Sequence, residues 1–195
     1  MKSPLPQSAD ELELKARVDD PAALETTIVE AGGELMFRGE MIDRRYDRKG
    51  KLERHDEVLR LRVFRPDTGA APFGVLGWKG PVSVRDGYKH REEHETQVAQ
   101  PEAARIILER LGYEVVLRID RKIAEYRLAG AMVRIEWYPA MDVLVEIEGE
   151  PEAIEGAVRA TGLSRDRFLP VALPHFVRAY EERTGQTARL ALRSC

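Results

Sequence analysis

The chain has 195 residues, of which 43% are hydrophobic and 33% are charged, and its formal net charge is −3. This length suffices for one domain whose core needs neither disulfides nor a structural metal. The nearly balanced charge argues against general nucleic-acid binding, which requires a net basic surface. The single cysteine, Cys195, excludes an internal disulfide and a cysteine-based metal site.

No apolar run is long enough to span a bilayer, and residues 1–10 lack the apolar core of a signal peptide. We therefore expect a protein of the reducing cytoplasm that has no membrane partner. Residues 1–10, which contain two prolines, are predicted to form a flexible lead-in. Residues 11–184 are predicted to form a single domain, and residues 185–195 a tail.

The first half of the chain is predicted to begin with a strand over residues 11–18. A helix follows over residues 21–31, with Asp20 as its N-cap, Pro21 at its first position and Gly32 at its end. Alternation of apolar and polar residues then predicts strands over residues 35–47, 58–65, 73–78 and 88–98.

The second half repeats this coarse order of helix and strands. A helix is predicted over residues 101–111, again begun by proline and ended by glycine. Strands are predicted over residues 115–126, 132–138 and 143–148. Two further helices are predicted over residues 151–161 and 174–184.

Most of the predicted strands carry charged residues at a spacing of two. Because successive side chains of a strand point to opposite faces, these residues share one face, and apolar residues such as Leu12 and Leu14 share the other. The series is Glu11, Glu13, Lys15; Arg60, Arg62; Lys89, Arg91, Glu93, Glu95; Arg134, Glu136; Glu146, Glu148, with Lys79 at the end of a less polar strand.

Two architectures fit this charged face. In the first, an antiparallel sheet has one face under helices and the other in water. In the second, the sheet closes into a barrel and the charged face becomes its lumen. A solvated face normally mixes Thr, Ser and Gln with Lys, whereas these positions are nearly all Arg, Lys and Glu. Charges buried in a lumen must be paired or liganded, so a closed tunnel would accept a polyanion together with divalent cations.

An ordered set of motifs spanning residues 10–182 resembles the CYTH family, the triphosphate tunnel metalloenzymes. Among its members the chain looks most like bacterial proteins of the class IV adenylyl cyclase type. The motifs are Glu11-x-Glu13-x-Lys15, Asp43 to Tyr46, Leu59 to Arg62, Trp78-Lys79-Gly80-Pro81, Lys89-x-Arg91-Glu92-Glu93-x-Glu95 and Glu146-Ile147-Glu148.

The resemblance implies an α+β fold, in which about eight antiparallel strands form a closed, charged tunnel with helices packed outside. It implies a tunnel that holds a triphosphate with Mg²⁺ or Mn²⁺. The implied metal ligands are Glu11, Glu13, Glu146 and Glu148. The implied catalytic residues are Glu11, Glu13, Lys15 and Glu136. The implied phosphate-binding residues are Arg60, Arg62, Lys79, Lys89, Arg91, Arg121 and Arg134.

The predicted function is that of a metal-dependent enzyme of the adenylyl cyclase type, which converts ATP to cyclic AMP and pyrophosphate. One alternative is a tripolyphosphatase or a nucleoside or thiamine triphosphatase. Another is a non-catalytic module that binds polyphosphate or nucleotides. The expected partner is ATP or another triphosphate, with no nucleic acid, and the outward apolar helices would allow a homodimer.

Three positions depart from the family pattern. Family members usually carry a Lys-x-Arg pair where this chain has Arg121 and Ile123, and Arg118 could replace the missing arginine only if the strand register slips. Glu136 stands where members tend to carry Asp, and Asp142 where they often carry Gly. These departures leave the fold prediction intact and bear on the specific activity.

Other candidate sites are interpreted structurally. The four histidines, His55, His90, His94 and His175, lack the spacing of a zinc site and are expected at the surface. Trp78 and Tyr138 are interpreted as outward-facing core aromatics, with stacking on a nucleobase as the alternative. The basic pair Arg44-Arg45 is interpreted as part of a solvated turn.

Overall fold

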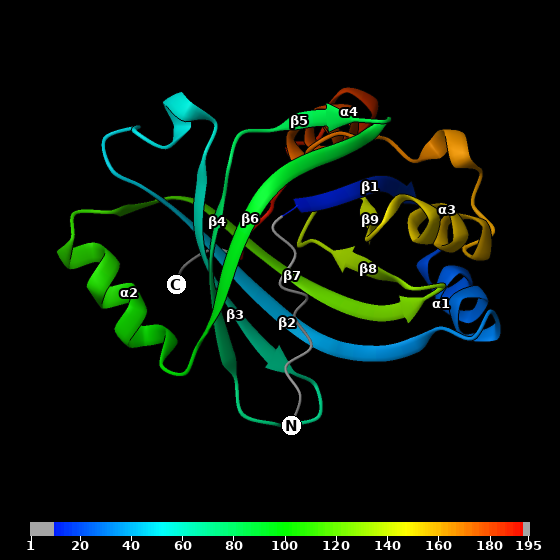
Figure 1. The fold of residues 1–195 in the computed structure, drawn as a ribbon, viewed down its shortest axis with the longest axis horizontal. Helices are drawn as coiled ribbons and strands as arrows, with labels where there is room; N and C mark the ends of the chain where they lie inside the picture. The colour runs from blue at the N-terminus through cyan, green and yellow to red at the C-terminus, as the bar shows by residue number, and fades with distance from the viewer. Residues whose placement is uncertain (1–9, 193–195) are drawn as a thin grey trace.

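The structure, a computed structural model, describes residues 10–192 (Figure 1). Within this range, eight antiparallel strands close into a barrel in the order β1-β9-β8-β7-β2-β3-β4-β6, and β6 pairs back onto β1. Their bounds are β1 Asp10–Val18, β2 Glu34–Asp47, β3 Val58–Pro66, β4 Phe73–Lys79, β6 Tyr88–Val98, β7 Glu114–Leu128, β8 Ala131–Trp137 and β9 Val143–Glu148. The short strand β5, Ser83–Arg85, adds to the edge of β6 and lies where the sequence predicted a loop.

All four predicted helices form: α1 Pro21–Glu30, α2 Pro101–Arg110, α3 Pro151–Ala160 and α4 Leu173–Thr184. Asp20 caps α1 as predicted, because its Oδ1 accepts a hydrogen bond from the Ala23 N–H at 3.0 Å. The helix ends at Gly32, whose φ of +85° lies in the left-handed region that glycine tolerates. No helix in residues 10–192 has an apolar stretch long enough to cross a membrane.

The apolar core lies outside the barrel wall, between the strands and the helices. The helices α1 and α3 cover the outward faces of β1, β7, β8 and β9, where Leu14, Tyr126 and Ile147 pack with Ile28 and Ile154. On another part of the wall, α2 packs its Leu108 against Tyr46 and Leu61. Where helices cover the wall, the apolar face of the strands points outward and the charged face inward, and the pairing of β6 with β1 confirms the closed barrel in place of the open sheet with one wet face.

One end of the barrel is covered by α4 and by the segment that follows it. Leu173 and Phe176 of α4 pack on Ile119, Tyr138 and Leu144. Asp142 anchors the helix, because its carboxylate accepts hydrogen bonds from the Arg183 guanidinium at 2.5 and 2.7 Å. The chain after α4 then pairs with the barrel wall at two places. On β7, the Asp120 N–H donates to the Leu190 carbonyl at 2.7 Å. Just after β8, residues 140 and 189 form a β-bridge.

Towards the opposite end, part of the lumen is apolar. Met41, Phe64, Val75 and Ile123 form a buried cluster, and the partly buried rings of Phe37 and Phe73 pack against it. The rings of Phe64 and Phe73 stack face to face, with their centroids 4.9 Å apart. Ile123 is therefore part of a packed apolar cluster, which gives a physical reason for an aliphatic residue at this inward position.

Gly39 lies on β2 where the strand bends between β3 and β7, and we expect Gly39→Ala to destabilise the barrel. A Cβ at this position would lie 2.1 Å from the Arg65 carbonyl oxygen, so the backbone of β3 would have to move. We expect the free energy of unfolding, measured by urea denaturation, to fall by about 2–3 kcal/mol.

The matched control is Gly156→Ala on α3, where the nearest atom to the new Cβ is the Ala129 Cβ at 3.3 Å. Alanine is favoured over glycine in a helix by roughly 0.5–1 kcal/mol, so this variant should be neutral or more stable. Equal stability of the two variants would show that the close approach at Gly39 does not constrain the bend.

Candidate functional site

The lumen of the barrel holds a group of buried charged residues to which all eight barrel strands contribute. Each of these side chains belongs to a residue that is less than a tenth exposed, in an environment where an unpaired charge is strongly unfavourable. They are Glu13 and Lys15 of β1, Asp43 of β2, Arg60 and Arg62 of β3, Lys79 of β4, Lys89 and Arg91 of β6, Arg121 of β7, Arg134 and Glu136 of β8, and Glu146 of β9.

One side of the lumen is acidic. Glu13, Glu146 and Glu148 each offer a carboxylate oxygen, and these three oxygens lie within 4.8 Å of one another. Their adjacency follows from the strand register, because Glu13 of β1 pairs directly with Glu148 of β9. Two strands that place carboxylates on the same inward face thus build a compact group of three.

Basic residues hold this acidic group in place. Lys89 Nζ lies 2.6 Å from Glu13 Oε1, and Lys15 forms an ion pair with Glu146. Arg134 contacts Glu146 Oε1 at 2.8 Å and Glu148 Oε1 at 3.4 Å. Each of the three carboxylates therefore lies against at least one cation.

The pKa shifts agree with this arrangement. Burial alone would lower the pKa of the Lys15 ammonium, but the negative charges of Glu146 and Glu136 outweigh it and raise that pKa. Burial would raise the pKa of Glu146, but Lys15 and Arg134 hold it well below its usual range. Both groups are therefore charged over the whole physiological pH range.

Three converging carboxylates are the donor set that hard divalent cations prefer. The three oxygen atoms lie within 4.8 Å of one another, close enough to face one ion, and Mg²⁺ usually completes its shell with water or phosphate oxygens. Glu148 is the most accessible of the three, since its side chain is 23% exposed. We therefore regard Glu13, Glu146 and Glu148 as residues that could hold a divalent metal.

The opposite side of the lumen is basic, and its cations contact the same two carboxylates. Arg60 contacts Glu93 at 2.9 Å and Glu95 at 3.2 Å, and Arg62 forms an ion pair with the same Glu95. Lys79 Nζ lies 3.1 Å from Glu93 Oε2. Burial and the neighbouring charge of Arg60 lower the pKa of Arg62, as expected where guanidinium groups crowd together.

Asp43 lies among these arginines and was not among the predicted site residues. It is fully buried, and within the described residues neither of its oxygens accepts a hydrogen bond. Its nearest ion-pair partners are Arg121 at 3.9 Å and Arg60 at 4.0 Å. Burial would raise the pKa of Asp43, but the charges of Arg60 and Arg121 lower it, so this carboxylate is ionised and holds the guanidinium groups around it.

Glu136 connects the two sides of the lumen. Its carboxylate lies 3.1 Å from Arg121 Nε and 3.8 Å from Lys15 Nζ, and it accepts a hydrogen bond from the Tyr138 hydroxyl at 2.6 Å. Arg121 in turn lies over the Tyr138 ring, 5.7 Å from its centroid. Tyr138 therefore faces the lumen, and its interpretation as an outward-facing core aromatic was wrong.

Arg91 lines the lumen but its guanidinium is engaged with backbone oxygen atoms. Its Nε donates to the Gly80 carbonyl at 2.6 Å, and one terminal nitrogen donates to the Asp56 carbonyl and also to Asp56 Oδ1 at 3.1 Å. It fastens the turn around Asp56 to the segment after β4. Of the predicted phosphate-binding residues, Arg91 is thus the one whose guanidinium is most committed to the fold.

The remaining predictions have mixed outcomes. Arg118 is exposed and pairs in register with Arg44, so no register slip brings it inward. Trp78 stacks with His94 on the outer face, with centroids 5.9 Å apart, and His175 is exposed, as expected for both.

The interpretation of Arg44-Arg45 as a solvated turn was wrong, because both residues lie within β2. The backbone of Glu11 belongs to β1, but its side chain lies outside the part of the chain that the structure describes, so its role stays a prediction.

The charged lumen contains a cavity of about 80 Å³, whose mouth lies beside the start of α4. Its wall combines charges from both sides of the lumen with a few apolar residues at the mouth. The lining residues are Glu13, Lys15, Arg45, Arg60, Lys79, Lys89, Arg91, Arg121, Arg134 and Glu146, with Val58, Ala172, Leu173 and Pro174 at the mouth.

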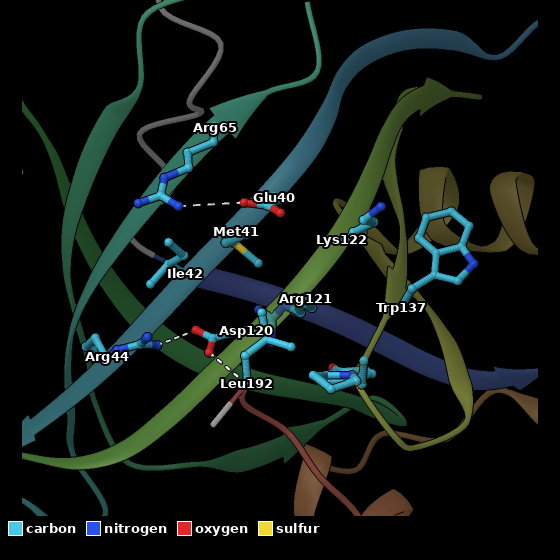
Figure 2. A pocket seen from close by; sticks show the side chains of 12 residues that line it. Glu40, Met41, Ile42, Arg44, Arg65, Asp120, Arg121, Lys122, Trp137 and Leu192 are labelled. Carbon is cyan, nitrogen blue, oxygen red and sulfur yellow. Dashed lines mark hydrogen bonds and ion pairs between the residues drawn. The ribbon is translucent and has the colours of Figure 1, made fainter. Parts of the chain in front are cut away.

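A larger cavity, of about 290 Å³, lies over the outer face of β2 and β7 (Figure 2). Its charged residues pair with one another: Arg44 contacts Asp120 at 2.6 Å, and Arg65 lies 3.7 Å from Glu40. Trp137, Lys122 and Leu192 also line it. Because the group of three converging carboxylates and most of the buried arginines and lysines lie in the lumen, we place the candidate site there and not in this outer groove.

A closed barrel with acids on one inner side and bases on the other defines a tunnel protein able to bind a metal and an anion together. The chain belongs to the CYTH family, whose domain model matches residues 9–160. Proteins of this family are typically metal-dependent enzymes that bind triphosphates in the tunnel. No curated protein matches the chain in sequence.

Solved structures share the fold. A candidate adenylate cyclase from Vibrio parahaemolyticus has a TM-score of 0.72 and 19% identity, over 88% of this chain and 99% of that one. A protein from Pyrococcus horikoshii OT3 has a TM-score of 0.68 and 23% identity, over 87% and 98%. A Hippeastrum protein, a candidate adenylyl cyclase with a dominant triphosphatase activity, has a TM-score of 0.62 and 19% identity, over 94% and 100%. At these identities the likeness establishes the fold alone.

We expect Glu95→Gln to change how stability depends on pH. Burial raises the pKa of Glu95, but a hydrogen bond with Glu93 and the charges of Arg62 and Arg60 outweigh it and lower the pKa to about 2, from an ordinary value of 4.5. A carboxyl group with a depressed pKa stabilises the fold above its ordinary pKa, and this contribution is lost as the pH falls towards 2.

Urea denaturation between pH 7 and pH 2.5 tests this expectation. The variant should be less stable than the parent at pH 7, by about 2 kcal/mol, and the difference should shrink below pH 4.5. Glu92→Gln, on the outer face of the same strand, is the control and should follow the parent at every pH. A constant difference between Glu95→Gln and the parent across this range would contradict the expectation.

Proposed function

We propose that this protein is a metal-dependent enzyme that acts on a triphosphate bound in the tunnel, and that it converts ATP to cyclic AMP and pyrophosphate. A single observation carries the proposal: one lumen holds both the Glu13–Glu146–Glu148 group and a set of buried arginines and lysines. These charges are not needed to fill the lumen, since apolar residues of similar size would fill it with a smaller desolvation penalty. Together they match a polyanion that arrives with a divalent cation.

The basic residues have the chemistry to bind phosphate oxygens. Arg60 and Arg62 present planar forks suited to two oxygens at once, and Lys79 and Lys89 present compact charges. Their present partners, Glu93, Glu95 and Glu13, hold these groups in position before a ligand arrives. A divalent cation on the acidic group would neutralise charge on the phosphoryl oxygens during an in-line displacement.

We propose a positioning role for Glu136. Lys15, Arg121 and the Tyr138 hydroxyl surround its carboxylate, and it is only 1% exposed. Its carboxylate oxygens are thus already engaged by two cations and a hydroxyl donor. Glu136 would therefore orient Lys15 and Arg121 towards the ligand, in place of the catalytic role that the sequence assigned to it.

Hydrolysis of the terminal phosphate is the second candidate function. In the cyclase reaction, the ribose 3′-oxygen attacks the α-phosphorus, its proton leaves to solvent, and pyrophosphate departs. In hydrolysis, water attacks the terminal phosphorus, and diphosphate and orthophosphate form. Ile123 adds weight to this candidate, because it departs from the Lys-x-Arg pair of the family pattern and lies in apolar surroundings. The triphosphatase activity named for the Hippeastrum protein is consistent with this alternative.

Product analysis distinguishes the two reactions. The purified protein would be incubated with ATP, and separately with inorganic triphosphate, in the presence of Mg²⁺ or Mn²⁺, and the products separated by ion-exchange chromatography. Cyclic AMP and pyrophosphate from ATP would support the cyclase. Orthophosphate without cyclic AMP would support the hydrolase, and binding of either compound without any product would leave only the binding module.

We expect Glu148→Gln to lower turnover of the preferred triphosphate by more than about tenfold and to weaken Mn²⁺ binding by a similar factor. The amide keeps the shape of the side chain but removes one of the three negative charges that a cation would meet. Isothermal titration with Mn²⁺ and initial rates measure the two effects. Glu152→Gln, an exposed position on α3, is the control. Unchanged Mn²⁺ binding and rate in Glu148→Gln would overturn the assignment of the metal site.

A further inference from the structure

Arg45 is an inward-facing cation that the sequence did not assign to the site. It lies on β2 in register with Arg60 of β3 and Leu117 of β7, and it shares the inward face of its strand with Asp43. It lines the same lumenal cavity as Arg60 and Lys79. In the barrel order, β2 is separated from β1 by three strands on either side, so Arg45 approaches the lumen from the wall across from Glu13.

Arg45 differs from its neighbours because it is left without a partner. Within residues 10–192 its guanidinium makes no hydrogen bond and no ion pair, and its Nε is sealed from solvent without an acceptor. Burial and the like charges of Arg60 and Arg121 lower its pKa, and Asp43 offsets them only in part. Arg45 is partly exposed, but its Nε is enclosed without an acceptor, so the residue contributes little to the stability of the fold.

A guanidinium with open donors at a cavity whose other charges are paired is the arrangement that a phosphate group would complete. We propose that Arg45 binds a phosphate oxygen of the tunnel's ligand, from the wall across from the Glu13–Glu146–Glu148 group. This inference rests on the proposed function and adds to it a contact that the family motifs did not indicate.

The neighbouring arginine provides a matched control. Arg44 lies on the same strand but faces outward, where it pairs with Asp120 at 2.6 Å in the outer groove (Figure 2). Arg45→Met and Arg44→Met make the same chemical change on opposite faces of β2. They therefore separate a role in the lumen from a general effect of removing an arginine from this strand.

Two measurements on the full chain, both without metal ions, test the inference. The first is the thermal midpoint of each protein without ligand. We expect Arg45→Met to melt at the same temperature as the parent or higher, since a guanidinium whose enclosed Nε has no acceptor is removed, and Arg44→Met to melt lower, since Asp120 loses its partner. A structural role for Arg45 would instead lower the midpoint of Arg45→Met.

The second measurement is the affinity for inorganic triphosphate by titration calorimetry. We expect Arg45→Met to bind about 10- to 100-fold more weakly than the parent, and Arg44→Met to bind within about twofold. If the parent binds and Arg45→Met binds equally well, the inference is overturned while the proposed function stands. If the parent itself does not bind triphosphate, with or without Mg²⁺, the proposed function fails and the inference fails with it.

Arg45→Lys keeps the inference testable if Arg45→Met does not fold. Lysine keeps the positive charge but cannot offer a two-pronged contact, so we expect its affinity for triphosphate to fall about three- to tenfold. An affinity equal to that of the parent would overturn the direct contact through the guanidinium.

Discussion

The rest of the structure depends on how charge is kept inside the barrel. Each barrel strand turns an apolar face outward to the helices, so its charged face must point into the lumen, where water is scarce. Burying ions singly would cost more than a small domain can offset, and the barrel remains folded because its closure sets acids against bases. Lys89 of β6 with Glu13 of β1 is the pair that closure brings together, since these two strands are joined only where the barrel closes.

This pairing has a consequence for ligand binding under the proposed function. A cation on the acidic group would compete with Lys15, Lys89 and Arg134 for Glu13, Glu146 and Glu148. The basic groups released in this exchange would then be available to phosphate oxygens. Binding of the metal and of the triphosphate would therefore favour each other, because each supplies the counter-charge that the other displaces. The free energy of binding either ligand would therefore be the difference between the free energy of its new contacts and that of the internal ion pairs that it replaces.

Much of this arrangement could be predicted from the sequence, because a spacing of two is an unambiguous signal for one face of a strand. It placed Glu13, Lys15, Arg60, Arg62, Lys89 and Glu146 on one strand face, which the family resemblance identified as the lumen, and the caps and glycines located the helices to within one residue. The same parity also applied to Tyr138, two residues after Glu136, and to Arg45, two after Asp43, but aromatic character and an adjacent basic residue outweighed it. The apolar cluster around Ile123 could not be predicted, because it joins residues of β7, β2, β3 and β4, and a spacing of two within each strand does not give the order of strands in the sheet.

The choice between cyclisation and hydrolysis is not made by the charged wall. Arginines, lysines and a metal would bind the same triphosphate in either reaction, since its charge does not depend on which oxygen attacks. What differs is whether a ribose hydroxyl or a water molecule lies in line, and this depends on how the nucleoside is held outside the phosphate site. In this chain the mouth of the lumenal cavity is formed by Val58, Ala172, Leu173 and Pro174, which are small or apolar and supply no polar side chain to orient a ribose. Specificity for a nucleotide would therefore depend on the shape of this mouth and on the position of α4, and the charged lumen would bind whichever triphosphate that mouth admits.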